Sequence, residues 1–175
     1  MASNLPEDAL RDVMRNVPSP VTVVTFAGAD GPRGVTIGSF TSVSLAPPLV
    51  SFNVMIESSA HDDLVRAGHF RIHILQAHQA ILGERFAFPE LSSQAQFDSI
   101  AHLIDERGIP RLDDVLATLE CRHFDALGAG DHTLLLGEVL KAEVHRSGRP
   151  LVYYNSSYRE VGKEVMPAVH PEAAR

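Results

Sequence analysis

The chain has no tryptophan, a single cysteine and no excess of basic residues. Because Cys121 stands alone, neither an intramolecular disulfide nor a zinc site built from cysteines can form. The formal charge of −7, with histidine neutral, excludes the extended basic face that general nucleic-acid binding requires. We therefore expect a protein of the reducing cytoplasm that has no nucleic-acid partner.

Long apolar runs are also lacking. A membrane-spanning helix needs about 20 consecutive apolar residues, and no such run occurs among the 175 residues. The first eight residues are acidic rather than basic and then apolar, so we expect neither a signal peptide nor a membrane partner. The length predicts one domain with a sizeable core, here residues 1–162, followed by an aperiodic tail at 163–175.

Strand patterns occupy most of the chain. The expected strands lie at 21–26, where β-branched residues dominate, at 70–74, where apolar and polar residues alternate as in a half-buried strand, and at 116–124, 133–144 and 151–154. The expected helices lie at 5–17, 61–67 and 77–86, and residues 87–110 are mixed. Strands without strict β-α-β alternation predict a mainly β fold with flanking helices, a closed or split antiparallel barrel.

Residues 34–55 form the most distinctive segment. A β-branched run is followed by the hydroxyl residues Ser39, Thr41, Ser42 and Ser44, then by Pro47-Pro48 and a second β-rich run. This order predicts two strands that flank a hydroxyl-rich connection. Hydroxyls on a small-residue backbone suit the polar edge of a planar heteroaromatic ring, although a hairpin with its hydroxyls in water is the more common meaning of such a segment.

Three segments, in order, resemble those of the short-chain flavin reductases, the reductase components of two-component flavin-dependent monooxygenases. They are Gly-Val-Thr-Ile-Gly-Ser-Phe-Thr-Ser-Val-Ser-Leu-Ala-Pro-Pro-Leu-Val at 34–50, Gly-Asp-His-Thr-Leu-Leu-Leu-Gly-Glu-Val at 130–139, and Pro-Leu-Val-Tyr-Tyr at 150–154 continuing to Tyr-Arg at 158–159. The resemblance implies an FMN-binding split barrel of Greek-key type. It also implies NAD(P)H:flavin oxidoreductase activity, a homodimer, and a monooxygenase that receives the reduced flavin.

The same resemblance implies two sets of site residues. Those expected to bind the flavin, FMN or FAD, are Val35, Thr36, Ile37, Gly38, Ser39, Thr41, Ser42, Asn53, Val54, Met55, Ser58, Ser59, Ala60, Arg85 and Phe86. Those expected near the nicotinamide of NADH or NADPH are His132, Tyr153, Tyr154, Asn155 and Tyr158, with His132 as the catalytic residue. Without the resemblance, a histidine at a strand start is more often structural.

Carboxylates surround the serine pair that is expected to receive the flavin phosphate. Glu57 precedes Ser58 and Ser59, and Asp62 and Asp63 follow them. Negative charge at this loop is expected to weaken the binding of a phosphate group.

Other site types are not indicated. Gly128-Ala-Gly130 lacks the third glycine and the following helix of a dinucleotide-binding fingerprint. The histidines are spread over several elements without a cysteine partner, so no metal site is expected. Two alternatives to a reductase stay open: a non-catalytic split-barrel protein that binds flavin or haem, and an enzyme similar to pyridoxamine-phosphate oxidase.

Overall fold

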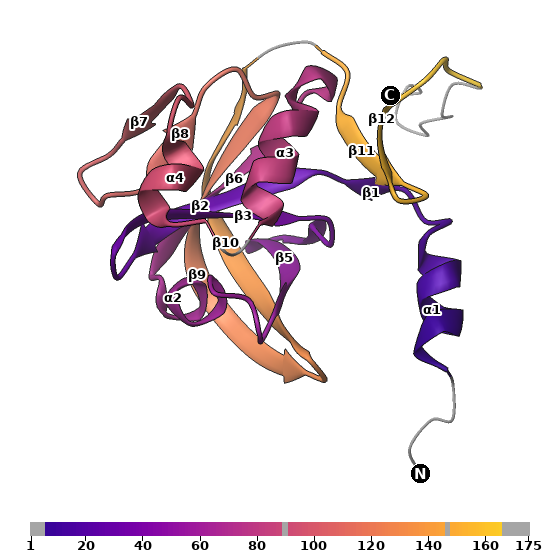
Figure 1. Ribbon diagram of the computed structural model, residues 1–175. Helices are drawn as coiled ribbons and strands as arrows, with labels where there is room; N and C mark the ends of the chain where they lie inside the picture. The colour runs from indigo at the N-terminus through magenta and orange to yellow at the C-terminus, as the bar shows by residue number, and fades with distance from the viewer. Residues whose placement is uncertain (1–5, 89–90, 146–147, 166–175) are drawn as a thin grey trace, which may run out of the picture.

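The computed structural model describes residues 6–88, 91–145 and 148–165, and strands predominate among them (Figure 1). The main sheet is antiparallel, with the strand order β3-β2-β6-β9-β10-β5-β4. Its strands are β2 (Thr22–Gly28), β3 (Gly31–Ile37), β4 (Thr41–Leu45), β5 (Pro48–Met55), β6 (His69–Ile74), β9 (Ala117–Ala129) and β10 (His132–Val144). The predicted mainly β, antiparallel architecture is confirmed.

Two small sheets and a few short helices surround the main sheet. The small sheets contain β1 (Ser19–Pro20), β11 (Leu151–Tyr154) and β12 (Ser157–Glu160), and β7 (His102–Ile104) with β8 (Pro110–Leu112). The helices are α1 (Glu7–Met14), α2 (His61–Arg66), the 3-10 turn η1 (Ala77–Gln79), α3 (Ala80–Ala87) and α4 (Ser93–Phe97). Helices α3 and α4 pack on β3, whereas α1 stands apart from the main sheet (Figure 1). No helix in the described ranges has the length and apolar character needed to cross a bilayer.

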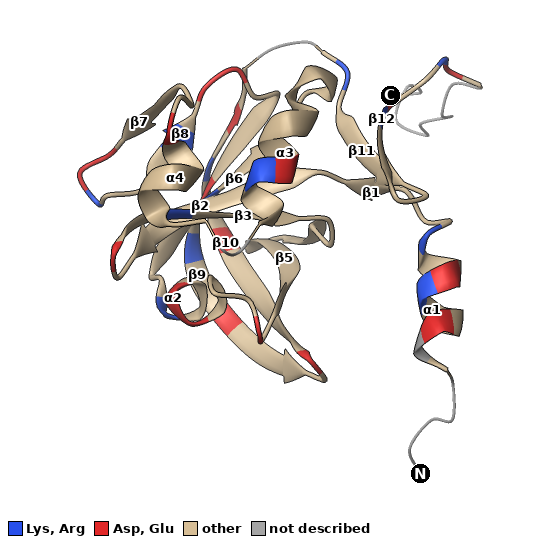
Figure 2. Cartoon of the chain, viewed as in Figure 1, with Lys and Arg blue, Asp and Glu red and all other residues tan. Residues whose placement is uncertain are grey.

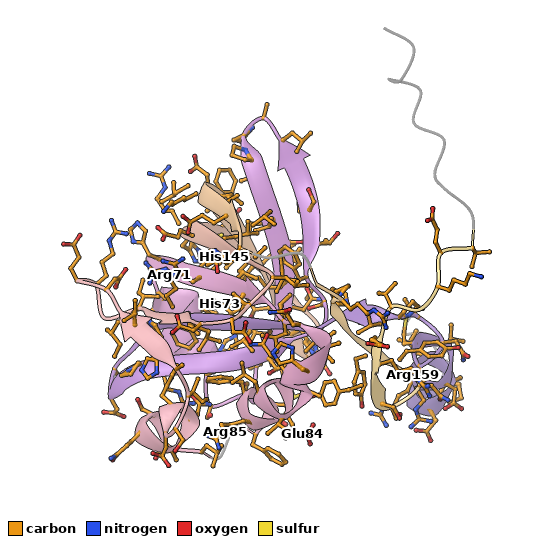
Figure 3. The ribbon with its side chains drawn as sticks, turned by 90° about the horizontal axis from the view of Figure 1, so that it is seen from above. Arg71, His73, Glu84, Arg85, His145 and Arg159 are labelled. Atoms are coloured by element: carbon orange, nitrogen blue, oxygen red, sulfur yellow. The ribbon has the colours of Figure 1, made fainter. Side chains whose placement is uncertain are left out.

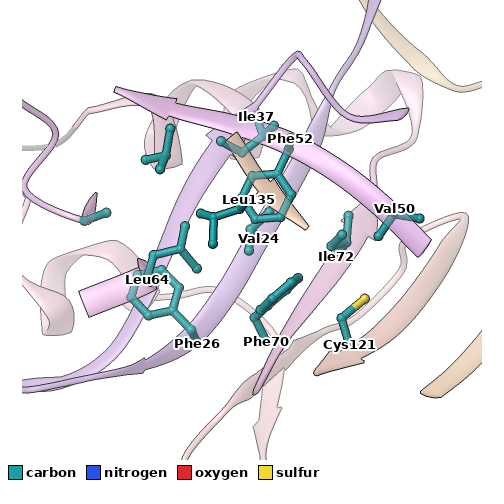
Figure 4. Packing of buried hydrophobic residues seen from close by; sticks show 12 residues of the cluster. Val24, Phe26, Ile37, Val50, Phe52, Leu64, Phe70, Ile72, Cys121 and Leu135 are labelled. Atoms are coloured by element: carbon teal, nitrogen blue, oxygen red, sulfur yellow. The ribbon is translucent and has the colours of Figure 1, made fainter. Parts of the chain in front are cut away.

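The core has two parts, one on each face of the sheet. In the first, the rings of Phe52 and Phe70 meet edge to face at 5.5 Å, and Phe26 and Leu64 are fully buried beside them (Figure 4). In the second, buried apolar residues such as Phe86 and others of α3 and α4 pack against β2. Burial of each such side chain contributes about 1.5–3 kcal/mol, so both faces of the central strands are fixed by packing.

This double covering corrects the sequence prediction for β6. The alternation at 70–74 predicted a half-buried strand, but Arg71 is only 8% exposed and His73 is completely buried (Figure 3). The β7–β8 hairpin covers the face that the alternation assigns to solvent. The Arg71 guanidinium donates to the carbonyl of Ile109 at 2.7 Å and to the carboxylate of Asp105 at 2.9 Å, and these bonds compensate the buried charge.

His73 connects β6 to its neighbours on both sides. The amide of Leu112 donates to His73 Nε2 at 3.1 Å, so Nδ1 carries the hydrogen and donates to the carbonyl of Val23 at 3.2 Å. Burial, together with the charges of Arg71 and Arg111, lowers the pKa of His73 to about 3. The ring is therefore neutral at ordinary pH, and both of its nitrogen atoms have partners.

The buried histidine should make the protein sensitive to acid. In the window between pH 6.5 and about 3 the unfolded chain binds a proton that the folded chain does not, so the free energy of unfolding falls as pH falls. We expect His73→Gln to destabilise the fold by about 1–3 kcal/mol at pH 7.5. The glutamine amide group matches the hydrogen-bonding groups of Leu112 and Val23 less well than the imidazole ring does. The gap between wild type and variant should then shrink by up to about 1.4 kcal/mol per pH unit below 6.5. Urea unfolding across that range checks this, and a constant gap would contradict it.

The hydroxyl-rich segment is a strand rather than the predicted connection. Residues 41–45 form β4, which pairs with β5 at the edge of the sheet, with a register shift between Ser42 and Ser44. The turn at Ala46-Pro47 brings the two strands together, and β-branched Thr41 and Val43 suit a strand. Thr41 and Ser42 are exposed.

The remaining predictions differ mainly at their boundaries. Helix α1 is shorter than the predicted 5–17, β9 extends beyond the predicted 116–124 to Ala129, and β12 was not predicted. Among the described residues nothing covers the apolar side chains of α1, since Val13 is 63% exposed and Met14 52%. Most of the predicted tail, from 166 onward, lies outside the described residues.

Candidate functional site

A pocket of about 550 Å³ opens where the main sheet does not close, between β3 and β5. Its volume lies in the range of small-molecule sites, about 300–1,000 Å³. The lining residues come from β3, β5, the loop after β5, α3, α4 and the start of β10. They are Arg33, Gly34, Val35, Thr36, Ile37, Gly38, Ser39, Asn53, Val54, Met55, Glu57, Ser58, Ala60, Phe86, Ala87, Gln96 and His132.

The free edge of β3 forms one wall. The buried side chain of Gln96 accepts a hydrogen bond from the amide of Gly34 and donates to its carbonyl, both at 3.1 Å. Because backbone groups alternate in direction along an antiparallel strand, the amide and carbonyl of Thr36 face the same side as those of Gly34. The Thr36 hydroxyl is engaged elsewhere, donating to the carbonyl of Gly83 at 2.6 Å. Thr36 therefore offers a ligand its backbone rather than its side chain.

The opposite wall is β5. Beyond the residues paired with β4, the strand has one edge free, and the Ser39 hydroxyl accepts a hydrogen bond from the amide of Asn53 at 2.8 Å. This bond ties the end of β3 to β5 and closes one end of the gap. Phe86 lies at the base of the gap, only 1% exposed, and so close to Gly34 that an added Cβ there would be 2.6 Å from the ring. Val35 and Met55 add apolar side chains to the pocket lining. The gap thus combines an apolar surface with polar strand edges.

Arg33 places a cation at this pocket. Its Nη2 donates to the hydroxyl of Ser59 at 2.9 Å. Its Nε atom is buried and has no hydrogen-bond partner among the described residues. A buried guanidinium donor without a partner, beside the hydroxyls of Ser58 and Ser59, is suited to an anion. The sequence reasoning missed Arg33 because only the folding of β3 against the serine loop brings them together.

The three carboxylates around the serine pair have different environments. Asp62 lies 2.8 Å from His61 Nδ1, and this hydrogen bond, with the charge of Arg66, lowers the pKa of Asp62. Asp63 accepts a hydrogen bond from the amide of Ala29 at 3.2 Å. Only Glu57 lines the pocket. Of the three carboxylates that surround the serine pair in the sequence, only that of Glu57 therefore belongs to the pocket.

His132 is the first residue of β10 and lies opposite Met55 of β5. Its Nδ1 is 2.7 Å from the carboxylate of Asp131, and this hydrogen bond is the main cause of the lowered pKa of Asp131. In the neutral ring a carboxylate accepts from Nδ1–H, so Nε2 is left as an acceptor. His132 thus brings a polar, oriented ring to the rim of the pocket.

Several predicted residues lie elsewhere in the single chain. Arg85 donates to the carbonyl of Asp98 and does not line the pocket, although its neighbour Phe86 does. Thr41 and Ser42 belong to the edge strand β4. The predicted nicotinamide residues of β11, β12 and their turn lie in the small sheet, near Arg159 in Figure 3. They are Tyr153, Tyr154, Asn155 and Tyr158.

The tyrosines of the small sheet have partners of their own. Tyr153 and Tyr158 meet edge to face at 5.3 Å, and Arg159 lies 5.9 Å from the ring centre of Tyr154. Burial, with a hydrogen bond to Glu84, raises the pKa of Tyr158 to about 12. Within the described ranges no group of three or more His, Cys, Asp or Glu side chains is placed to hold a metal ion. Charges of both signs are interspersed over the chain (Figure 2).

The contact between Gly34 and Phe86 can be tested directly. We expect Gly34→Ala to destabilise the protein by about 1–3 kcal/mol, because the new methyl group pushes the Phe86 ring out of a packed position. Gly128→Ala is the matched control, since a Cβ at that strand position meets nothing within 4 Å. Urea unfolding of both variants checks the prediction. An equal loss in the free energy of unfolding for Gly34→Ala and Gly128→Ala would contradict it.

A family model, a relative and solved structures all relate this chain to flavin reductases. A model of the flavin reductase like domain matches residues 14–162. The chain is 38% identical over 156 residues to the FMN reductase (NADH) SmoA of Agrobacterium fabrum, covering 89% of this chain and 87% of that protein.

Two solved structures have the same fold. One is BorF, the flavin reductase component of a bacterial two-component tryptophan halogenase, with a TM-score of 0.82, 33% identity, and coverage of 91% of this chain and 100% of that one. The other is the NADH:FAD oxidoreductase SgcE6 of Streptomyces globisporus in complex with NAD and FAD fragments. It has a TM-score of 0.83, 34% identity, and coverage of 95% of this chain and 100% of that one.

Proposed function

The chain belongs to the flavin reductase like domain family, and we propose that it transfers hydride from NADH to FMN or FAD bound between β3 and β5. The observation that carries the proposal is the pocket, which is lined by apolar side chains such as Val35 and Met55, by the edge of β3 at Thr36 and by the guanidinium of Arg33. A flavin has the matching parts in a matching order: a flat ring, a polar ring edge and a phosphate. The reductase activity predicted from the three sequence segments agrees with the family and with the relatives.

The residues present fit a flavin. The backbone amide and carbonyl of Thr36 are complementary to the alternating N–H and C=O groups on the pyrimidine edge of the ring. At the other end, Arg33 and the hydroxyls of Ser58 and Ser59 are suited to the phosphate, because hydrogen bonds between ionised partners are the strong ones. The unpartnered Nε of Arg33 supports this placement, since a buried donor without an acceptor is costly.

When bound, the flavin supplies the acceptor of two electrons that amino acids lack. The protein's part is to bind, to orient and to exclude water. The strand edges of β3 and β5 would hold the edges of a bound ring and would leave room for a nicotinamide to come within about 3–3.5 Å of it, the distance that hydride transfer requires. The Thr36 amide stabilises negative charge that develops on the ring edge. His132 at the rim is placed to receive the nicotinamide amide group through Nε2.

A homodimer and a recipient oxygenase complete the proposal. Helix α1 carries Leu10, Val13 and Met14, all more than half exposed, with charged residues on its other face. An apolar helix face of this kind is favourable only when it is covered, and a second copy of the chain is the partner we propose. The reduced flavin passes to a separate flavin-dependent monooxygenase, by analogy with relatives such as BorF that are components of two-component systems.

The activity is tested with the purified protein. We expect it to bind FMN or FAD and to oxidise NADH only when flavin is present, measured as loss of the absorbance band of the reduced nicotinamide. Unchanged absorbance with both flavins and both nicotinamides would overturn the proposal. Flavin binding without oxidation of NADH would favour a non-catalytic flavin-binding protein. Reduction of the bound flavin by pyridoxamine phosphate rather than by NADH would favour an enzyme similar to pyridoxamine-phosphate oxidase.

His132 should matter for the nicotinamide more than for the flavin. We expect His132→Ala to lower kcat/KM for NADH about tenfold or more while the Kd for flavin changes less than about threefold. The control is His78→Ala, which removes an exposed histidine that pairs with Asp114 outside the pocket. Steady-state kinetics and flavin fluorescence titration give the two values. An equal loss of kcat/KM for NADH and of flavin affinity would assign His132 a structural role.

A further inference from the structure

We propose that Glu57 is a specificity-determining residue, whose carboxylate weakens the binding of a flavin in proportion to the charge of its phosphate. This inference rests on the function proposed above, and it concerns which flavin the pocket prefers and how tightly the pocket holds it.

Two backbone hydrogen bonds fix the position of Glu57. The amide of Ile56 donates to the carbonyl of Asp131 at 3.0 Å, and the amide of Ser58 donates to the carbonyl of Met55 at 3.0 Å. The residues on both sides of Glu57 are therefore held against β5 and the start of β10. Its exposed side chain lines the same pocket as Arg33, so the carboxylate belongs to the lining at the proposed phosphate site.

Glu57 takes no part in the ion pairs of the described residues around it. In the part of the chain that the structure describes, the neighbouring ion pairs use Asp62 and Asp63 with His61 and Arg66, and none includes Glu57. Arg33 directs one Nη atom to the hydroxyl of Ser59 rather than to a carboxylate. One cation and one anion therefore act together on any ligand at this end of the pocket.

The three common flavins differ in the charge that they bring there. Riboflavin has no phosphate. FMN ends in a phosphate monoester with a charge of about −1.5 to −2 at pH 7. In FAD the phosphate next to the ribityl chain is part of a diphosphate and carries a single negative charge. FAD carries its second negative charge on the outer phosphate, and repulsion by a fixed carboxylate falls with distance. Glu57 therefore acts mainly on the phosphate next to the ribityl chain and disfavours FMN most, FAD less and riboflavin least.

The experiment is a charge series at this one position. Kd values for riboflavin, FMN and FAD are measured by fluorescence titration, at low ionic strength, for wild type, Glu57→Gln and Glu57→Lys. We expect Glu57→Gln to tighten FMN about five- to tenfold and FAD about two- to threefold, with riboflavin changed less than twofold. Glu57→Lys should tighten FMN further. Stopped-flow dissociation should show a slower release of FMN from both variants.

Two further variants serve as references. Arg33→Gln should weaken FMN and leave riboflavin nearly unchanged, which checks that the phosphate lies at this end of the pocket. Glu106→Gln makes the same change in net charge at the exposed turn between β7 and β8, outside the pocket lining, and should leave all three Kd values unchanged. Urea unfolding of each variant identifies any change that arises from loss of folded protein.

The outcomes separate this inference from the proposed function. If wild type binds none of the three flavins, the proposed function fails and the inference fails with it. If wild type binds flavin and oxidises NADH, but Glu57→Gln alters FMN and riboflavin equally or alters neither, only the role of Glu57 is overturned. An equal effect of Glu106→Gln would show that overall charge, rather than the position of Glu57, governs the affinity.

Discussion

The unclosed edge of the main sheet is the constraint on which the site depends. Buried backbone groups must have hydrogen-bond partners, and an exposed strand edge invites pairing with another chain. Here Gln96 pairs with both backbone groups of Gly34, and Ser39 bridges to Asn53. Between these two ties the edge at Thr36 stays available, so the fold satisfies part of its own edge and leaves a short length for a flat polar ligand.

The surrounding packing keeps this gap open at a fixed width. Phe86 contacts Gly34 so closely that no larger residue fits on β3 at that point. On the far side of the sheet, the edge-to-face pair of Phe52 and Phe70 fixes β5 and β6. Because both walls belong to strands that contribute to the packed core, the gap is present in the chain without a ligand. Binding energy from the ring is then not needed to order the protein.

The sequence predicted the fold class and much of the pocket lining, and the reason lies in how local the signals are. The Val35–Ser39 run and the 53–55 run are contiguous, and both line the pocket. Arg33 and Gln96 could not be found in this way, since their roles arise from contacts 26 and 62 residues apart along the chain. For the same reason the alternation in β6 was misread: a covering hairpin from much later in the sequence buries the face that carries Arg71.

Affinity at such a site must meet two opposing demands. A reductase that passes reduced flavin to another protein needs enough binding energy to align two rings, yet it must release one of them in each turnover. In the proposed mode of binding, the apolar lining and strand edges would act on the ring, where alignment matters, whereas Arg33 and Glu57 would act on the phosphate, which takes no part in the reaction. Opposing charges at the phosphate therefore reduce affinity without disturbing the geometry of hydride transfer. Weak retention can in this way be built into the pocket at the end farthest from the chemistry.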